Sequence, residues 1–208
     1  MKIKLLNYTR KQKEYEFEKI KTILEAKGNP NKIDHSNGSS SFHFICEGSN
    51  IGKDLINHLL KNNANPNLKN YFDLTPFHSF CSNQKLNTDV LKFFLENNAD
   101  SEAQDLLDKD TPYLVYCKNN SICLEGLKIF LNHFRKTKKM ERGNFFESIF
   151  LKFLFSQKNS ENQLRDEGII SFLFNNSKHF IDGSFLVKSF HFFFFSKDSK
   201  IKKRNTVG

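Results

Sequence analysis

The sequence predicts an all-α protein, a solenoid of stacked helix-loop-helix units joined by short hairpin connectors. Two observations carry this prediction. The segment Ser40–Cys46 recurs as Thr75–Cys81 and again as Thr111–Cys117, at spacings of 35 and 36 residues. An apolar helical run begins 15 positions after the start of each copy. Repeats of this period are typical of supersecondary units that bury their apolar faces only against neighbouring units.

The N-terminal unit carries a degenerate form of the repeated segment. Its second helix is expected around Ile20, Ile23 and Leu24, with Gly28–Asn31 as its ending, and this places the degenerate segment at 4–7. A terminal repeat needs a polar outer face because no neighbour covers it. The residues expected on that face are Arg10, Lys11, Lys13 and Glu14.

The first helix of a later unit begins at a hydroxyl residue, as Thr75 illustrates. Pro76 follows it, and a proline at the first helical position lacks only a backbone donor that would be unpaired there anyway. We expect this helix to end at about Cys81. The polar stretch 82–88 then forms the loop to the second helix.

The second helix carries apolar residues on one face. In this unit Asp89 is expected to cap it, and the face is formed by Val90, Leu91, Phe94 and Leu95. The ending Asn97–Asp100 matches Asn62–Asn65 in the preceding unit. Asparagine tolerates the left-handed conformation that a helix end requires. Turn-forming residues at 67–73 then lead into the next Thr-Pro.

Two of these segments carry a family resemblance. Thr75–His78 resembles the TPLH signature of ankyrin repeats, and Leu95–Asp100 resembles the ending of that family's second helix. The resemblance implies that His43 and His78 are structural groups whose rings bond the backbone and the signature hydroxyl residue. A lone, unclustered histidine is also seldom a catalyst.

Two units depart from the signature. Ser40 and Ser41 stand in place of Thr-Pro, and Leu114 stands in place of the histidine. We expect weaker local polar bonds in both units. The apolar pattern stays in register, so the predicted fold is unchanged.

The repeats are expected to cover residues 1–134. The units are about 1–33, which is the N-terminal capping unit, then 34–69, 70–105 and 106–134. Residues 135–182 are interpreted as a degenerate fifth repeat with an insertion. Residues 183–208 are interpreted as an incomplete repeat and a basic C-terminal tail.

Catalytic motifs are absent from the sequence. It has no glycine-rich phosphate loop, no nucleophile elbow and no paired histidines on a helix face, so we predict no enzyme, no catalytic residues, no cofactor and no metal. Asp105, Asp108 and Asp110 form the densest acidic group. They are expected to bond the backbone of a turn, because the glycine and closing glutamate of a calcium loop are missing.

Several features predict a cytoplasmic or nuclear protein with no membrane span. Lys2 and Lys4 interrupt any apolar signal core, and no stretch approaches the roughly 20 apolar residues of a membrane helix. Cys46, Cys81 and Cys117 share one repeat position, so they would lie about one repeat apart and too far to bridge. We expect them to be small buried thiols.

The predicted function is that of a protein-binding module. In the resembled family, partners dock on a concave surface built from hairpin tips and the exposed sides of first helices. Transferred by position, the resemblance implicates Tyr71, Phe72, Asp73, Ser79, Ser82 and Asn83 in one unit, and Leu106, Leu107, Asp108, Val115 and Lys118 in the next.

The apolar residues in the two turns are the most informative of this set. Large side chains on a rigid scaffold are typical of interface hot spots. The alternative is that Phe72 and Leu106 pack one hairpin on the next. If Tyr71 binds a partner, Tyr71→Ala should weaken that binding and leave the thermal stability almost unchanged.

Other functions stay open as alternatives. The net charge of +9 permits nucleic-acid binding, which we regard as the weaker reading because no groove-reading motif accompanies the charge. The chain could also be a fragment of a longer multidomain ankyrin-repeat protein. The partner is expected to be a protein of unspecified identity, and the chain itself is expected to be a monomer.

Overall fold

The computed structural model describes residues 4–49, 51–119 and 121–137. The chain divides into two compact units, Met1–His133 and Phe134–Gly208. Of the second unit, only 134–137 are among the described residues. The predicted fifth repeat and the predicted incomplete repeat with its basic tail therefore lie almost wholly outside them.

The described residues are all-α, as the sequence predicts. They form eight helices and no strand, and an isolated antiparallel bridge joins Ile33 to Ser40. The helices are α1 (Leu5–Thr9), α2 (Phe17–Glu25), α3 (Ser41–Cys46), α4 (Lys53–Lys61), α5 (Pro76–Cys81), α6 (Thr88–Glu96), α7 (Pro112–Lys118) and α8 (Leu124–Lys136).

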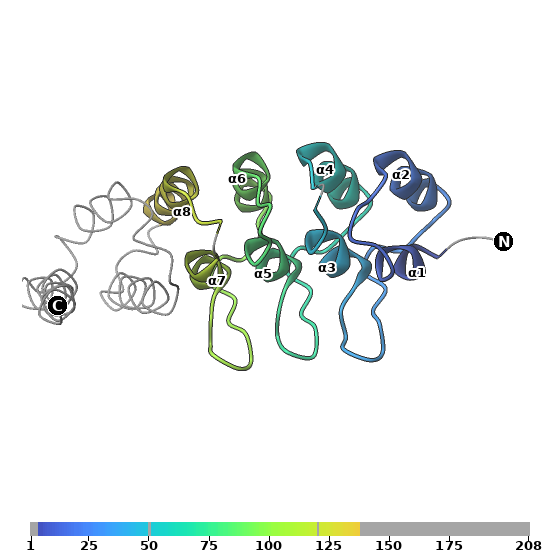
Figure 1. Ribbon diagram of the computed structural model, residues 1–208, viewed down its shortest axis with the longest axis horizontal. Coiled ribbons are helices and arrows are strands. Elements are labelled where there is room, and N and C mark those ends of the chain that lie inside the picture. Colours follow the sequence, from blue (N-terminus) through green and yellow to red (C-terminus); the bar gives the residue numbers. More distant parts are fainter. Residues whose placement is uncertain (1–3, 50, 120, 138–208) are drawn as a thin grey trace, which may run out of the picture. The chain divides into compact units, whose positions relative to one another are not determined.

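Within the first unit the helices alternate between two layers (Figure 1). Helices α1, α3, α5 and α7 contact one another in that order, and α2, α4 and α6 do the same in the second layer. Three connectors, 26–40, 62–75 and 97–111, leave the helices on one side (Figure 1). We call them connectors 1, 2 and 3. Successive helix pairs therefore pack side by side and present their connectors in a row.

The first helices begin at the hydroxyl residues that the sequence indicates. Ser40, Thr75 and Thr111 have extended backbones, and each side-chain oxygen accepts a hydrogen bond from the backbone N–H three residues later. Pro76 and Pro112 occupy the first helical positions. Helix α5 ends at Cys81 as predicted. Local capping chemistry thus determines where these short helices start.

The start of α6 corrects one prediction. Its capping residue is Asn87, whose Oδ1 accepts the Asp89 N–H at 2.9 Å. Asn87 has the extended backbone of a cap, so the helix starts at Thr88, one residue before the predicted cap at Asp89. Asp89 instead lies in the first turn, where its negative charge interacts favourably with the positive end of the helix dipole.

The ends of the second helices follow the prediction. Asn63 and Asn98 adopt left-handed backbone angles, with φ of 61° and 60°. Each is the second residue after the last helical position of α4 or α6. The Asn-Asn pairs therefore end these helices through the conformational tolerance of asparagine.

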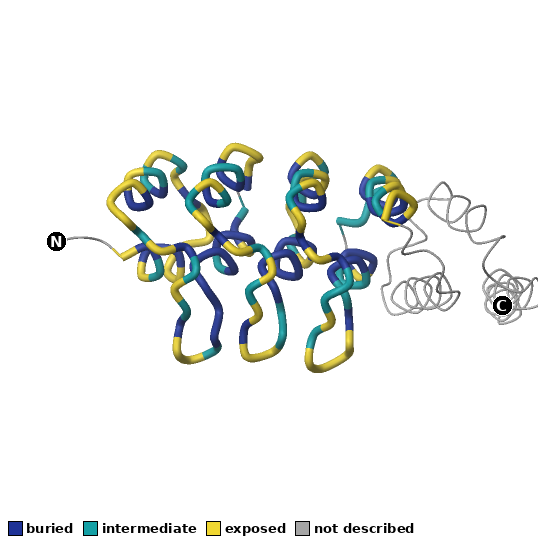
Figure 2. Tube along the Cα trace, turned by 180° about the vertical axis from the view of Figure 1, so that it is seen from behind, coloured by how far each residue is buried: buried dark blue, intermediate teal, exposed yellow. Residues whose placement is uncertain are grey.

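The core of the first unit lies between the two layers and is rich in aromatic side chains. Phe94 of α6 is fully buried, with ring centroids 5.8 Å from Phe42, 5.2 Å from Phe77 and 5.1 Å from Phe80. Figure 2 shows the burial concentrated on the facing sides of the helices, while the connector tips are exposed. The apolar face predicted from sequence spacing is the packed face.

The three cysteines at the shared repeat position are buried and unbridged. Cys46, Cys81 and Cys117 are free thiols. Burial raises the pKa of Cys46 and Cys81 well above its ordinary value and raises the pKa of Cys117 to about 12. A thiol without accessible thiolate is inert, so these residues act as packing groups.

Candidate functional site

Each connector is closed at its base by a side chain that bonds the turn backbone. The N–H of Asn70 donates to the Leu74 carbonyl at 2.9 Å, and its Oδ1 accepts the N–H groups of Phe72 and Leu74. Asp34 and Asp105 occupy the same place in connectors 1 and 3 and also accept backbone N–H groups. For Asp105 this is the turn-bonding role that its position in the acidic group predicts.

Backbone hydrogen bonds join neighbouring connectors. The Tyr71 N–H donates to the Asn37 carbonyl at 3.1 Å, which links connector 2 to connector 1. The Leu106 N–H donates to the Phe72 carbonyl at 2.9 Å, which links connector 3 to connector 2. The tips are therefore held in register by main-chain bonds that do not depend on side-chain identity.

Two buried histidines tie the first helices to the connectors that follow. Each ring accepts the backbone N–H of its capping residue at Nδ1, so the network assigns the proton to Nε2. The Nε2 of His43 then bonds the Leu74 carbonyl at 2.9 Å, and that of His78 bonds the Asp110 carbonyl at 3.1 Å. Burial lowers the pKa of both histidines. They are neutral structural groups, in agreement with the expectation.

The prediction of weaker local polar bonds is wrong for the repeat unit in which Ser40 caps the first helix. The Ser40 Oγ lies 2.8 Å from the ring of His43, and the Thr75 Oγ1 lies 2.9 Å from that of His78. The two caps are equivalent because the hydroxyl makes these bonds, and serine supplies it as well as threonine does. In the unit with Leu114 the cap bond remains, since Thr111 Oγ1 accepts the Leu114 N–H at 3.3 Å.

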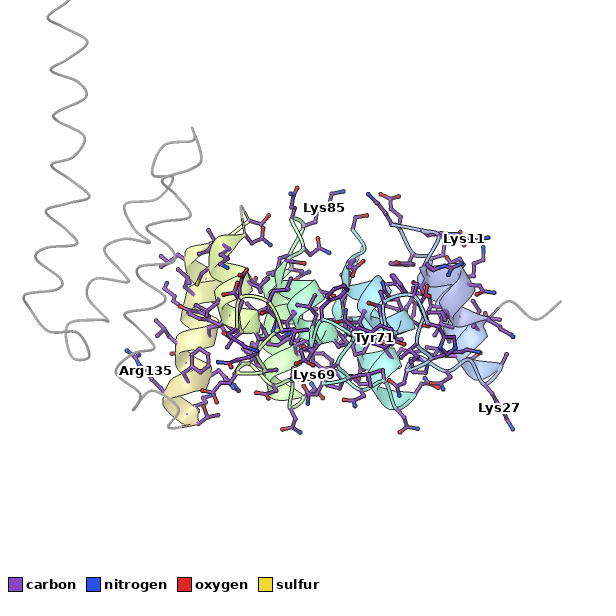
Figure 3. The ribbon with its side chains drawn as sticks, turned by 90° about the horizontal axis from the view of Figure 1, so that it is seen from below. Lys11, Lys27, Lys69, Tyr71, Lys85 and Arg135 are labelled. Atoms are coloured by element: carbon purple, nitrogen blue, oxygen red, sulfur yellow. The ribbon has the colours of Figure 1, made fainter. Side chains whose placement is uncertain are left out.

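Four large apolar side chains are exposed on the connector tips. In the described part of the chain, the large hydrophobic residues that are exposed are Tyr71 at 56 %, Phe72 at 45 %, Leu106 at 50 % and Leu107 at 75 %. We call these four residues the tip patch. They belong to two adjacent connectors, and Tyr71 lies centrally in the view onto the connectors (Figure 3).

The alternative in which Phe72 and Leu106 pack connector against connector accounts for only part of their surface. Their backbones are bonded to each other, yet about half of each side chain stays exposed. Tyr71 is supported from one side, because a Cβ added at Gly38 would overlap its ring. The tip patch is thus held in place and still open to solvent.

The polar residues predicted beside Tyr71 are engaged within the chain. Asp73 pairs with Lys69 at 3.6 Å. Ser79 is buried, with its Oγ 3.4 Å from the Glu47 carboxylate, and the Ser82 Oγ donates to the Ser79 carbonyl at 2.8 Å. Of the three predicted residues Asp73, Ser79 and Ser82, only Ser82 is exposed as a whole.

Of the residues predicted in the next unit, some are likewise engaged within the chain and others are exposed. Lys118 bonds the buried carboxylate of Asp110 and lies 4.0 Å from that of Asp108. These contacts link the C-terminal end of α7 to connector 3. Val115 is half-buried, whereas Asp108 is exposed. The tip patch therefore offers more accessible surface than the helix side chains predicted with it.

Two asparagines tie successive connectors together, and the sequence analysis missed this role. The Asn31 Nδ2 donates to the Asn63 carbonyl at 2.7 Å, and the Asn67 Nδ2 donates to the Asn98 carbonyl at 2.9 Å. Asn31 and Asn67 lie one repeat apart in the sequence. That recurrence is the signal that could have identified them.

A second pair of asparagines makes equivalent bonds between the first helices. Asn83, which the resemblance assigns to partner binding, donates to the Cys46 carbonyl at 3.1 Å. Asn119 donates to the Cys81 carbonyl at 2.9 Å. Each side chain satisfies a carbonyl at the end of the preceding first helix, which would otherwise lack a partner. For Asn83 the geometry supplies a structural role.

Arg10 departs from the charged outer face to which the sequence assigns it. Its guanidinium pairs with Asp34 at 2.9 Å and so connects the end of α1 to connector 1. The Ser36 backbone N–H, the Arg10 guanidinium and the Ser36 hydroxyl lower the pKa of Asp34 to about 2. The ionised form of this carboxyl is therefore favoured by folding.

We expect protonation of Asp34 to contribute to the loss of stability at low pH. Its folded pKa is lowered from 3.8 to about 2, so the contribution is complete above about pH 4 and is lost as the pH falls towards 2. Asp34→Asn should flatten the fall of the urea midpoint between pH 4 and pH 2. The control is Glu25→Gln at an exposed position, and an equal flattening there would contradict the assignment.

Metal and membrane sites find no support in the part of the chain that the structure describes. No three side chains of His, Cys, Asp or Glu gather there as metal ligands. Within the same ranges no helix has the length and apolar character to cross a membrane.

No protein-family model matches the chain. No curated protein gives a significant match to it.

Proposed function

We propose that this chain is an ankyrin-repeat-type module, without enzymatic activity, that binds a partner protein through its connector tips and acts as a scaffold or adaptor. One observation carries the proposal. The four exposed large hydrophobic side chains of the described residues all lie on two adjacent connectors, where they form the tip patch. Contiguous apolar side chains on an otherwise polar surface are typical of interaction sites.

The rigidity of the tips supports binding. The main-chain bonds at Tyr71 and Leu106 hold the connectors in register, and Asn70 and Asp105 close the turns. A preorganised surface loses little conformational entropy when a partner docks. Tyrosine and phenylalanine are also large side chains that add contact area at low entropic cost.

The charge around the tip patch favours a protein over a nucleic acid. Connectors 2 and 3 carry Lys69 and Lys109 together with Asp73 and Asp108. Lys69 and Asp73 pair with each other, so the local field is mixed in sign. A phosphate backbone requires a surface of positive charge. The mixed charges form the polar rim expected around an apolar protein interface.

The double variant Tyr71→Ala and Leu107→Ala tests the tip patch. We expect it to weaken partner binding roughly tenfold or more, as truncated hot-spot residues do. Both side chains are more than half exposed, so the thermal midpoint should hardly change. The full chain is used to capture partners from native lysate at two salt concentrations, and the affinity of each purified partner is then measured.

The matched control is Lys61→Ala with Lys85→Ala, at two exposed positions outside the tip patch. A protein retained by the parent and by this control, but lost from the tip-patch variant, would support the proposal. Equal retention by all three chains would contradict it. Retention of salt-sensitive nucleic acid alone would favour the basic-surface alternative.

A further inference from the structure

A cavity opens on the first helix pair, at the opposite extreme of its unit from α7. Its volume is about 590 Å³. This lies within the range of roughly 300–1,000 Å³ typical of small-molecule sites. It is lined by residues of α1, α2 and the start of connector 1, so it is separate from the tip patch.

Apolar side chains form part of the wall. Leu5 and Ile23 are buried and Leu6 is half-buried, and all three line the cavity. The equivalent surface of the next helix pair, α3 and α4, is covered by α1 and α2. This wall therefore offers apolar surface of the kind that other helix pairs bury.

The remaining wall is strongly basic. Four lysines line the cavity, Lys4, Lys19, Lys27 and Lys32, and no acidic residue does. The Lys19 ammonium lies 5.0 Å from the centroid of the Tyr8 ring. Lys4, Lys27 and Lys32 are exposed, and among the described residues none of these three forms an ion pair. Lys27 projects from this end of the unit (Figure 3).

Two backbone donors at the wall of this cavity are engaged within the chain. The Lys27 N–H is bonded to the Leu24 carbonyl and the Gly28 N–H to the Ile23 carbonyl. Neither group is free to bind an anion, so the attraction on this part of the wall comes from the lysine side chains. Lysine is a flexible point charge rather than a planar fork, so it attracts an anion without imposing a bidentate geometry.

We propose that this cavity binds a small amphiphilic anion, a carboxylate or sulfonate with an apolar body. The apolar body contacts Leu5, Leu6 and Ile23, and the acid group lies among the lysines. The size of the cavity, its apolar wall and its charge each select part of this ligand. A short anion leaves the apolar wall uncovered, and a neutral chain leaves the cluster of positive charge uncompensated.

Titration calorimetry on the full chain with dodecanoate, below its micelle concentration, tests the proposal. We expect saturable binding, with butyrate and dodecanol at least about tenfold weaker because each lacks one half of the recognition. Lys27→Gln with Lys32→Gln should reduce dodecanoate affinity roughly tenfold. The control is Lys61→Gln with Lys85→Gln, which removes the same net charge from exposed lysines outside the cavity.

Chemical acetylation followed by mass spectrometry determines independently where dodecanoate binds. Bound dodecanoate should protect Lys27 and Lys32 and leave Lys61 and Lys85 unprotected. Equal binding of dodecanol, equal losses in the two double variants, or protection at Lys61 and Lys85 would overturn the proposal. Tight binding of an acidic amphipathic peptide, with none of dodecanoate, would overturn it in favour of a macromolecular ligand.

Discussion

Replacing Phe94 by alanine is expected to destabilise the protein by about 3–5 kcal/mol, the usual cost of truncating a fully buried phenylalanine. Phe94 is 0 % exposed and its ring contacts those of Phe42, Phe77 and Phe80. The ring therefore joins α6 to the first helices of two successive units.

Urea unfolding followed by far-ultraviolet circular dichroism measures this loss. Phe93→Ala is the matched control, because Phe93 is the adjacent residue of the same type and is only half-buried. Its loss should be no more than about 1.5 kcal/mol, in proportion to the smaller area removed from water. Similar losses at both positions would show that Phe94 is not the central packing residue between the units.

Replacing His78 by leucine is expected to cost about 2–4 kcal/mol, although the side-chain volume is nearly preserved. The reason is that two buried polar groups lose a hydrogen bond, at about 1–3 kcal/mol for a group left without a partner. The Thr75 N–H loses its acceptor, the Nδ1 at 3.1 Å, and the Asp110 carbonyl loses the Nε2 donor at 3.1 Å while it keeps the Asp105 N–H at 3.0 Å. His35→Leu, at an exposed position on connector 1, is the control and should be nearly neutral.

The same substitution should change the pH dependence of stability. Burial lowers the folded pKa of His78 below 6.5, an effect partly offset by its bond to the Asp110 carbonyl. The unfolded chain then binds a proton on this histidine more readily than the folded chain does. The contribution of neutral His78 to the stability of the folded state is therefore complete above about pH 6.5 and declines as the pH falls towards the folded pKa. His78→Leu should reduce the fall in urea midpoint below pH 6.5. An unchanged slope would contradict this account.

His43 shares this chemistry and limits the size of the change. Its pKa is also lowered by burial, and it makes the same pair of bonds one unit earlier. A single leucine therefore removes part of the acid sensitivity, and the double variant with His43→Leu should remove more. The repeated environment makes the two sites internal controls for each other.

Local sequence chemistry determined much of the first unit. The caps at Thr75 and Thr111, the prolines that follow them and the endings at Asn63 and Asn98 depend on groups within a few residues of one another. Such short-range preferences are visible in sequence. The cap of α6 was misplaced because Asn87 and Asp89 are both good capping residues and only the backbone conformation distinguishes them.

The candidate site was predicted only in part. The apolar residues in the turns of connectors 2 and 3 are recognisable from sequence, but whether Phe72 and Leu106 face solvent depends on how the connectors meet. The structure places both about half exposed. Asn83 and Ser79 were assigned to a binding surface, whereas their bonds to Cys46 and Glu47 reach residues more than 30 positions away.

By itself, then, the sequence determined the all-α character, the repeat period and the local starts and ends of the helices, because helix caps and apolar spacing act over a few residues. Tertiary structure alone decided the Arg10–Asp34 pair, the bonds of Asn31 and Asn67 to later connectors and the basic cavity on the first helix pair. The ion pair and the asparagine bonds join side chains from different repeat units, whereas the cavity is formed by α1, α2 and the start of connector 1 within the first repeat unit. All of these features exist only after packing brings the elements together, since no local preference encodes the distance between them.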